Sequence, residues 1–123
     1  MIIVVEDDDG VRALTEELLL DHGYEVVTAP NGVEGQNRVR CEPRLSLLIT
    51  DIRMPGIGGW ELARRATEIR PHLKVLYITG YLGEQAPDDA PQAPLLRKPW
   101  HAAEFYKYIE ALIGSKEAHR FGP

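Results

Sequence analysis

The sequence contains little cysteine and no long apolar run. Cys41 is the single cysteine among 123 residues, which excludes an internal disulfide and any cysteine-rich metal site. Residues 1–8 carry no basic segment and their apolar run stops after Val5, which argues against a signal peptide and against a membrane span. From these absences we expect a cytoplasmic protein.

The sequence also lacks a surplus of basic residues. Its net charge is −5 and its isoelectric point is about 5.3, whereas proteins that bind nucleic acid or anionic membranes present a basic face. We therefore expect no direct contact with nucleic acid or with a membrane. A chain of this length with 44% hydrophobic residues can bury one sizeable core, so we expect one domain over residues 1–114 and a polar tail over 115–123.

Apolar runs alternate with segments of helical periodicity along the chain. The runs predict strands at residues 2–5, 24–28, 45–51, 73–78 and 95–97. The periodic segments predict helices at residues 9–22, 33–41, 60–69 and 101–113. Val11, Leu14, Leu18 and Leu19 form an apolar face on the first of these, while Gly35 and Asn37 make the second marginal by propensity. This alternation predicts an α/β fold with a parallel sheet and right-handed crossovers.

The central run, residues 45–51, delivers Asp51 into a turn rich in proline and glycine. In an open parallel sheet, chemistry collects outside the carboxyl ends of the strands, so Asp51 is a candidate reactive group. Taken alone, it is equally well explained as a turn residue, because Asp is common where a strand enters a turn.

Polar side chains follow three other predicted strands. Glu6 and Asp7 follow the first strand, Thr79 the fourth and Lys98 the fifth. Each residue alone could be a helix cap or a solvated charge. These explanations do not account for the presence of all of them at one edge of the sheet. Carboxylates gathered there repel one another unless a cation lies between them, and oxygen ligands without histidine or cysteine favour Mg²⁺. The ion and Lys98 would neutralise an incoming phosphoryl group, with Asp51 as the nucleophile of an aspartyl-phosphate reaction.

Four short segments occur in an order and at spacings typical of one protein family. They are the pair Glu6-Asp7 after Ile-Ile-Val-Val, the segment Thr50-Asp51-Ile52-Arg53-Met54-Pro55-Gly56, the segment Tyr77-Ile78-Thr79-Gly80-Tyr81, and the dipeptide Lys98-Pro99. Over almost its whole length the chain resembles the receiver domain of two-component response regulators, which include the chemotaxis response regulator. The resemblance implies a flavodoxin-like, doubly wound α/β domain with five parallel strands in the order 2-1-3-4-5.

The resemblance also implies a phosphoacceptor and a Mg²⁺ site. Asp51 matches the phosphoacceptor, which also contacts the metal, and Asp7 matches a direct metal ligand. Glu6 stands where many members have Asp and matches a ligand that acts through water. The backbone carbonyl of Arg53 matches a further ligand.

A second group of residues matches the switch of this family. Thr79 matches the hydroxyl that moves to the phosphoryl oxygen, and Lys98 matches the cation that contacts it. Lys98-Pro99 is expected to be a cis peptide. Arg53 and Tyr81 match positions that flank the path of the water that hydrolyses the phosphorylated state.

Two departures from the family concern the output surface. Leu95 stands where the family usually has an aromatic residue that rotates with the switch hydroxyl. Pro87, Pro91 and Pro94 each remove an amide donor between the fourth and fifth strands. We therefore expect a degenerate fourth helix, in which residues 82–94 form a mobile loop with at most one helical turn.

The sequence thus predicts a phosphorelay receiver that accepts a phosphoryl group from a histidine kinase or a histidine phosphotransfer protein. It would catalyse only its own phosphorylation and dephosphorylation, switch its contact with a downstream protein, and be a monomer or weak dimer. An alternative is a receiver domain excised from a hybrid sensor histidine kinase. A phosphohydrolase fits less well because Arg53 replaces its second Asp, and a flavodoxin-like electron carrier because acids follow the first strand.

Overall fold

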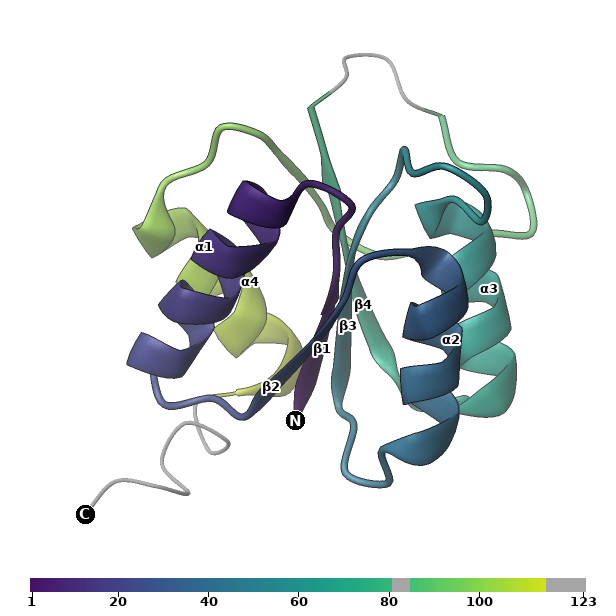
Figure 1. Cartoon of the computed structure of the whole chain (residues 1–123), viewed down its shortest axis with the longest axis horizontal. Coiled ribbons are helices and arrows are strands. Elements are labelled where there is room, and N and C mark those ends of the chain that lie inside the picture. Colours follow the sequence, from purple (N-terminus) through teal and green to yellow (C-terminus); the bar gives the residue numbers. More distant parts are fainter. Residues whose placement is uncertain (81–84, 115–123) are drawn as a thin grey trace.

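The computed structural model describes residues 1–80 and 85–114. Its strands are β1 (Ile2–Val5), β2 (Val26–Ala29), β3 (Leu47–Asp51), β4 (Lys74–Thr79) and β5 (Leu95–Arg97), and its helices are α1 (Asp9–Asp21), α2 (Gly32–Cys41), α3 (Gly59–Ile69) and α4 (Ala102–Ile113). The five strands form one parallel sheet in the order β2-β1-β3-β4-β5, which confirms the predicted flavodoxin-like fold (Figure 1). The predictions for Tyr81, for the first part of the expected loop at 82–84 and for the tail at 115–123 lie outside the described residues.

Helices cover both faces of the sheet, with α1 and α4 on one side and α2 and α3 on the other (Figure 1). β1 and β3 are buried along their whole length, as expected for apolar strands in the middle of a covered parallel sheet. Val5 of β1 pairs with Thr50 of β3, so the carboxyl ends of these strands meet at one edge. Among the described residues no helix is long and apolar enough to cross a membrane.

Helix α2 forms in full despite the weak propensity of its sequence. A Cβ on Gly35 would lie 2.8 Å from Cγ2 of Val5, so glycine allows the helix to approach β1 closely. Asn31 caps the helix by accepting a hydrogen bond from the amide of Glu34 at 2.9 Å. Packing and capping together outweigh the intrinsic cost of glycine within the helix.

Two local expectations for the first helix and second strand were wrong. The side chain of Leu14 is 54% exposed, whereas Leu19 is completely buried. Leu14 faces the loop after β5 rather than the sheet, and it lines an apolar cavity with Trp100. The second strand begins at Val26 rather than at residue 24, because the amide of Tyr24 still bonds to the carbonyl of Leu19 at the end of α1.

The C-terminal end of α1 is closed by residues of α4. The ring of His22 stacks on the ring of Tyr106, with 3.9 Å between their centroids. His22 Nε2 lies 3.2 Å from Oε1 of Glu110, and the Tyr106 hydroxyl donates a hydrogen bond of 2.8 Å to the carbonyl of Leu18. Contacts between residues 88 positions apart therefore hold these two helices together.

The described segment between β4 and β5, residues 85–94, contains no helix, as the prolines predicted. It makes one turn, in which the amide of Ala90 bonds to the carbonyl of Pro87 at 3.1 Å. The Tyr77 hydroxyl donates to the carbonyl of Pro91 at 2.9 Å, and Asp89 lies 3.7 Å from Arg64 of α3. The segment therefore lies against the N-terminal half of α3 (Figure 1).

Candidate functional site

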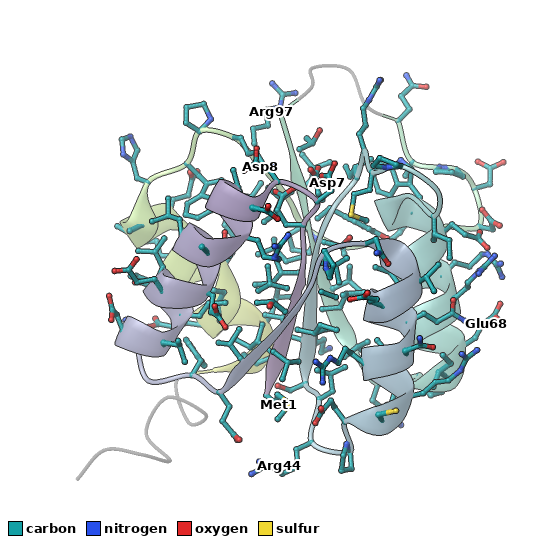
Figure 2. The ribbon with its side chains drawn as sticks, viewed as in Figure 1. Met1, Asp7, Asp8, Arg44, Glu68 and Arg97 are labelled. Carbon is teal, nitrogen blue, oxygen red and sulfur yellow. The ribbon has the colours of Figure 1, made fainter. Side chains whose placement is uncertain are left out.

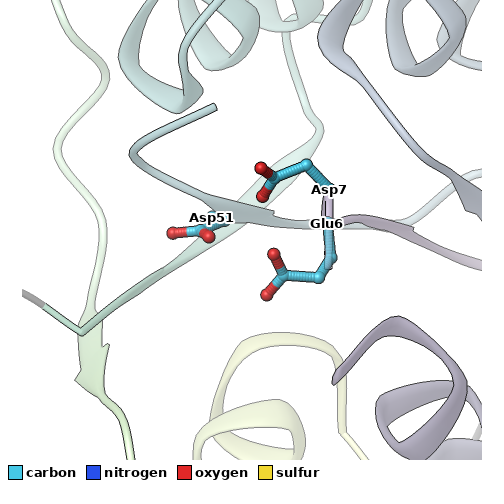
Figure 3. Close-up of side chains that lie close together, drawn as sticks. All are labelled: Glu6, Asp7 and Asp51. Atoms are coloured by element: carbon cyan, nitrogen blue, oxygen red, sulfur yellow. The ribbon is translucent and has the colours of Figure 1, made fainter. Parts of the chain in front are cut away.

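Three carboxylates converge at the carboxyl edge of the sheet. Glu6 and Asp7 follow β1, and Asp51 is the last residue of β3, so all three side chains leave neighbouring strand ends (Figure 3). One carboxylate oxygen from each lies within 4.8 Å of the others. Glu6 is 3% exposed and Asp51 is 8% exposed, while Asp7 is exposed. Figure 2 shows Asp7 at the end of the sheet opposite Met1, where β1 begins.

Backbone contacts on both sides fix the position of Asp51. Thr50 Oγ1 donates a hydrogen bond of 2.9 Å to the Asp51 carbonyl, and the amide of Ile52 bonds to the carbonyl of Ile78 at 3.0 Å. A Cβ on Gly59 would collide with the Asp51 carbonyl oxygen, so the start of α3 packs directly on this peptide. The strand end that carries Asp51 is thus held by a neighbouring strand and by a helix.

Lys98 reaches the carboxylates from the end of β5. Its Nζ lies 2.6 Å from Oε1 of Glu6 and 3.3 Å from Oδ2 of Asp51. The Lys98 amide bonds to the carbonyl of Thr79 at 2.8 Å, and the Lys98-Pro99 peptide is cis, as predicted. Burial lowers the pKa of Lys98, but the hydrogen bond to Glu6 and the charge of Asp51 outweigh burial and leave it above its ordinary value.

Glu6 is the most constrained of the carboxylates. Its amide bonds to the carbonyl of Ala29 at 3.1 Å, and its Oε2 accepts a hydrogen bond from the amide of Asp8 at 3.3 Å. Burial, together with the nearby carboxylate of Asp51, raises the pKa of Glu6 to about 7 against the lowering effect of the hydrogen bond from Lys98. A cation among these groups would stabilise the ionised form of Glu6.

The carboxylates line a cavity of about 510 Å³ that opens at the carboxyl edge of the sheet. Its lining includes Glu6, Asp7, Asp8, Val11, Asp51, Arg53, Gly80 and Lys98. The structure therefore brings together every predicted site residue except Thr79, which is completely buried at the end of β4, beside the cavity residue Gly80. The roles predicted for the Thr79 hydroxyl and for the Arg53 carbonyl stay predictions.

Sequence reasoning missed two residues that shape this edge. Arg12 donates from Nη1 to the carbonyl of Glu6 at 2.9 Å, and Gly59 packs on the peptide of Asp51. The only signal for Arg12 is a basic residue about one turn into a helix that starts beside the acidic pair. For Gly59 it is a glycine at the first position of a helix, where no side chain is required.

The donors at this edge fit a magnesium ion. They are carboxylate oxygens without histidine or cysteine, which is the chemistry that hard divalent cations prefer. Carboxylates this close and this buried are also costly without a cation beyond Lys98, as the raised pKa of Glu6 indicates. The acidic cluster is therefore compatible with Mg²⁺.

Comparisons with known proteins agree with this geometry. A sequence profile described as "Response regulator receiver domain" matches residues 2–110. The chain belongs to the response regulator receiver family. This receiver is 44% identical to the response regulator receiver protein CpdR of Brucella abortus (strain 2308), over 91% of this chain and 95% of that protein.

Two further matches come from sensor kinases. The chain is 36% identical to the CAI-1 autoinducer sensor kinase/phosphatase CqsS of Vibrio cholerae serotype O1, over 70% of this chain but only 12% of that kinase. A solved receiver domain of the hybrid histidine kinase CckA is 30% identical, with a TM-score of 0.79, and the match covers 91% of this chain and 97% of that domain. The chain is thus a receiver module of two-component signalling, and such modules are generally not classical enzymes.

Proposed function

We propose that this receiver accepts a phosphoryl group on Asp51 from a phosphohistidine donor and then changes its contacts with a downstream protein. One observation carries the proposal: the Asp51 carboxylate lies in the acidic cavity with its Oδ2 3.3 Å from the ammonium group of Lys98. A nucleophilic carboxylate beside a fixed cation is the arrangement that phosphoryl transfer to aspartate requires.

Asp7, Asp51, the carbonyl of Arg53 and, through water, Glu6 would hold Mg²⁺ at this edge. When bound, the ion neutralises charge on the phosphoryl oxygens. An oxygen of Asp51 attacks the phosphorus, the bond from phosphorus to the donor imidazole nitrogen breaks, and the electron pair stays on that nitrogen. Water later attacks the phosphorus, which releases phosphate and restores the carboxylate of Asp51.

Lys98 and Thr79 would distinguish the phosphorylated state from the unmodified one. Lys98 is held at 2.6 Å from Glu6, and a phosphoryl group on Asp51 offers it further oxygen acceptors. Thr79 lies one residue beyond Ile78, the β4 partner of Asp51, so Thr79 and Asp51 stand at neighbouring strand ends. Contacts made only after phosphorylation shift the population of two states, which is how such a receiver would signal.

An apolar patch beside the site would receive the donor. Val11, the exposed Leu14, Pro99 and Trp100 line a cavity of about 410 Å³ together with Lys98. A donor protein seated on this patch would bring its phosphohistidine to the cavity that holds Asp51. Sensor kinases among the relatives support a histidine kinase or a phosphotransfer protein as that donor, in a free-standing regulator or a hybrid kinase. The cytoplasmic location and the downstream partner stay predictions.

The test is labelling by acetyl phosphate, which needs no protein donor. With Mg²⁺ present, wild-type protein should gain one phosphoryl group by intact mass, and Asp51→Asn should gain none. Asp88→Asn, an exposed acid outside the cavity, is the matched control and should label like the wild type. Labelling that persists in Asp51→Asn would move the nucleophile elsewhere, and absence of labelling in the wild type would overturn the proposed function.

A further inference from the structure

Arg12 connects the acidic loop after β1 to the first turns of α1. Its Nη1 donates to the backbone carbonyl of Glu6 at 2.9 Å, and its Nη2 lies 2.6 Å from Oδ1 of Asp9. The Arg12 side chain is only 20% exposed, whereas that of Asp9 is 89% exposed. The Arg12 side chain therefore packs against the loop instead of extending into solvent.

The Glu6 carbonyl needs this donor because the sheet does not supply one. The pairing of β1 with both neighbouring strands ends at Val5, one residue before Glu6. A carbonyl at a half-buried strand end without a partner is costly, and Arg12 satisfies it. Of the Glu6 polar groups, the amide is held by Ala29, the carboxylate by Lys98 and the carbonyl by Arg12.

The same hydrogen bond sets the direction of Asp7. The Glu6 carbonyl belongs to the peptide group whose nitrogen is that of Asp7, and this group is planar. Fixing the carbonyl therefore fixes the plane from which the Asp7 side chain departs. Asp7 is exposed, so its orientation depends on the backbone more than on packing.

We propose that Arg12 is a positioning residue of the Mg²⁺ site, which holds the Glu6–Asp7 peptide so that both carboxylates face Asp51. This inference rests on the proposed function. Arg12 acts through the backbone, because its two hydrogen bonds go to the Glu6 carbonyl and to Asp9, which lies outside the cavity lining.

Charge and positioning predict opposite effects on metal affinity. Arg12 is a cation next to an acidic cluster, so by charge alone its removal makes the site more negative and strengthens Mg²⁺ binding. If Arg12 positions the peptide, its removal loosens the acidic pair and weakens binding. The sign of the change therefore separates the two roles.

The experiment titrates the whole chain with MgCl₂ by calorimetry and by amide shifts of Glu6 and Asp7. We expect affinity to fall by about tenfold in Arg12→Gln, as for residues that orient metal ligands elsewhere. Arg12→Lys keeps the charge but loses the two-pronged geometry, so it should bind between Arg12→Gln and wild type. Arg38→Gln is the matched control, since Arg38 is 52% exposed on α2, and it should bind like the wild type.

Further readouts separate positioning from a general loss of structure. Urea unfolding without Mg²⁺ should show that Arg12→Lys is folded before denaturant is added. Saturating Mg²⁺ should restore the rate at which acetyl phosphate labels this variant. If Arg12→Gln does not fold, the comparison of Arg12→Lys with wild type decides alone. Equal or tighter binding in Arg12→Gln, or wild-type binding in Arg12→Lys, would overturn the inference. Failure of the wild type to bind Mg²⁺ or to be labelled would instead refute the proposed function.

Discussion

The connections that follow β3 and β4 leave the same edge of the sheet but are held in different ways. After β3, residues 52–58 are closed by main-chain hydrogen bonds from Ile52 to Ile78 and from Gly59 to Ile52, at 3.0 and 2.8 Å. After β4, the described residues 85–93 are held to the rest of the molecule by side chains, Tyr77 to Pro91 and Arg64 to Asp89. Main-chain bonding to β4 resumes only at Pro94, whose carbonyl accepts a hydrogen bond from the amide of Tyr77 at 3.0 Å. The first connection follows the strand that ends in Asp51, and the second contains no helix in its described residues.

This difference separates a fixed element from an adjustable one. Main-chain hydrogen bonds between neighbouring elements persist through most side-chain changes, whereas a side-chain tether is lost with one substitution or one competing contact. The connection after β3 therefore suits a site whose geometry must not vary. The segment at 85–94, which has few backbone hydrogen bonds of its own, suits a surface that responds to phosphorylation or to a partner.

The largest effect should follow from adding one methyl group on the β3 side. Gly59→Ala places a Cβ against the Asp51 carbonyl, so α3 or the strand end must move, at a cost of about 1–3 kcal/mol in the free energy of unfolding. Gly80→Ala, at the end of β4, meets no described atom within 4 Å and serves as the matched control. Urea unfolding measures both variants, and equal stability would contradict the close packing of α3 on this peptide.

A smaller effect should follow from removing the tether on the β4 side. Tyr77→Phe deletes the hydroxyl that donates to Pro91, which should cost about 1 kcal/mol. Amide hydrogen exchange should speed up within residues 85–93 and stay unchanged within 52–58. Tyr108→Phe on α4 is the control. Unchanged exchange in 85–93 would show that the Tyr77 hydroxyl does not hold this segment.

The same tyrosine should give the molecule an alkaline pH dependence. Burial raises the pKa of Tyr77 from 10 to about 12, so between these values the unfolded state loses the proton and the folded state keeps it. Stability contributed by neutral Tyr77 is therefore complete below pH 10 and is lost as the pH rises toward 12. The wild type should lose more stability over this range than Tyr77→Phe in urea unfolding, and parallel curves would contradict this.

The smallest effect should come from the ion pair on the surface of α3. Asp89 is 72% exposed and lies 3.7 Å from Arg64, which is already bound to Glu61 and Glu68. Asp89→Asn should therefore change the free energy of unfolding by less than about 0.5 kcal/mol, and less still at high salt. A loss as large as that in Tyr77→Phe would mean that the ion pair is a principal tether of the segment.

Features set by local chemistry could be predicted from the sequence. Pro87, Pro91 and Pro94 act on their own backbone, so the absence of a helix at 85–94 follows from their positions. The apolar runs ending in Asp51 and Glu6 specify strands whose carboxyl ends meet in a parallel sheet. The sequence pattern alone therefore predicts the parallel sheet and the cluster of carboxylates at its edge.

Features that depend on a distant backbone atom could not be predicted in this way. The partner of Arg12 is a carbonyl, a group that every residue carries, so its sequence position gives no sign of the contact. Gly59 is needed because of how closely α3 approaches Asp51, which no local pattern encodes. Leu14 matched a helical apolar face, but that face extends beyond the sheet to the loop that contains Trp100.

The contact between α1 and α4 also orders events during synthesis. The core on the α2 and α3 side draws its buried residues from positions 3 to 77, whereas the core on the α1 side needs Phe105 and Ile109 of α4. As the chain leaves the ribosome, the first of these layers can close before the last helix exists. Leu19 and the ring of His22 complete their contacts only when α4 packs against α1, so this side of the sheet is finished last.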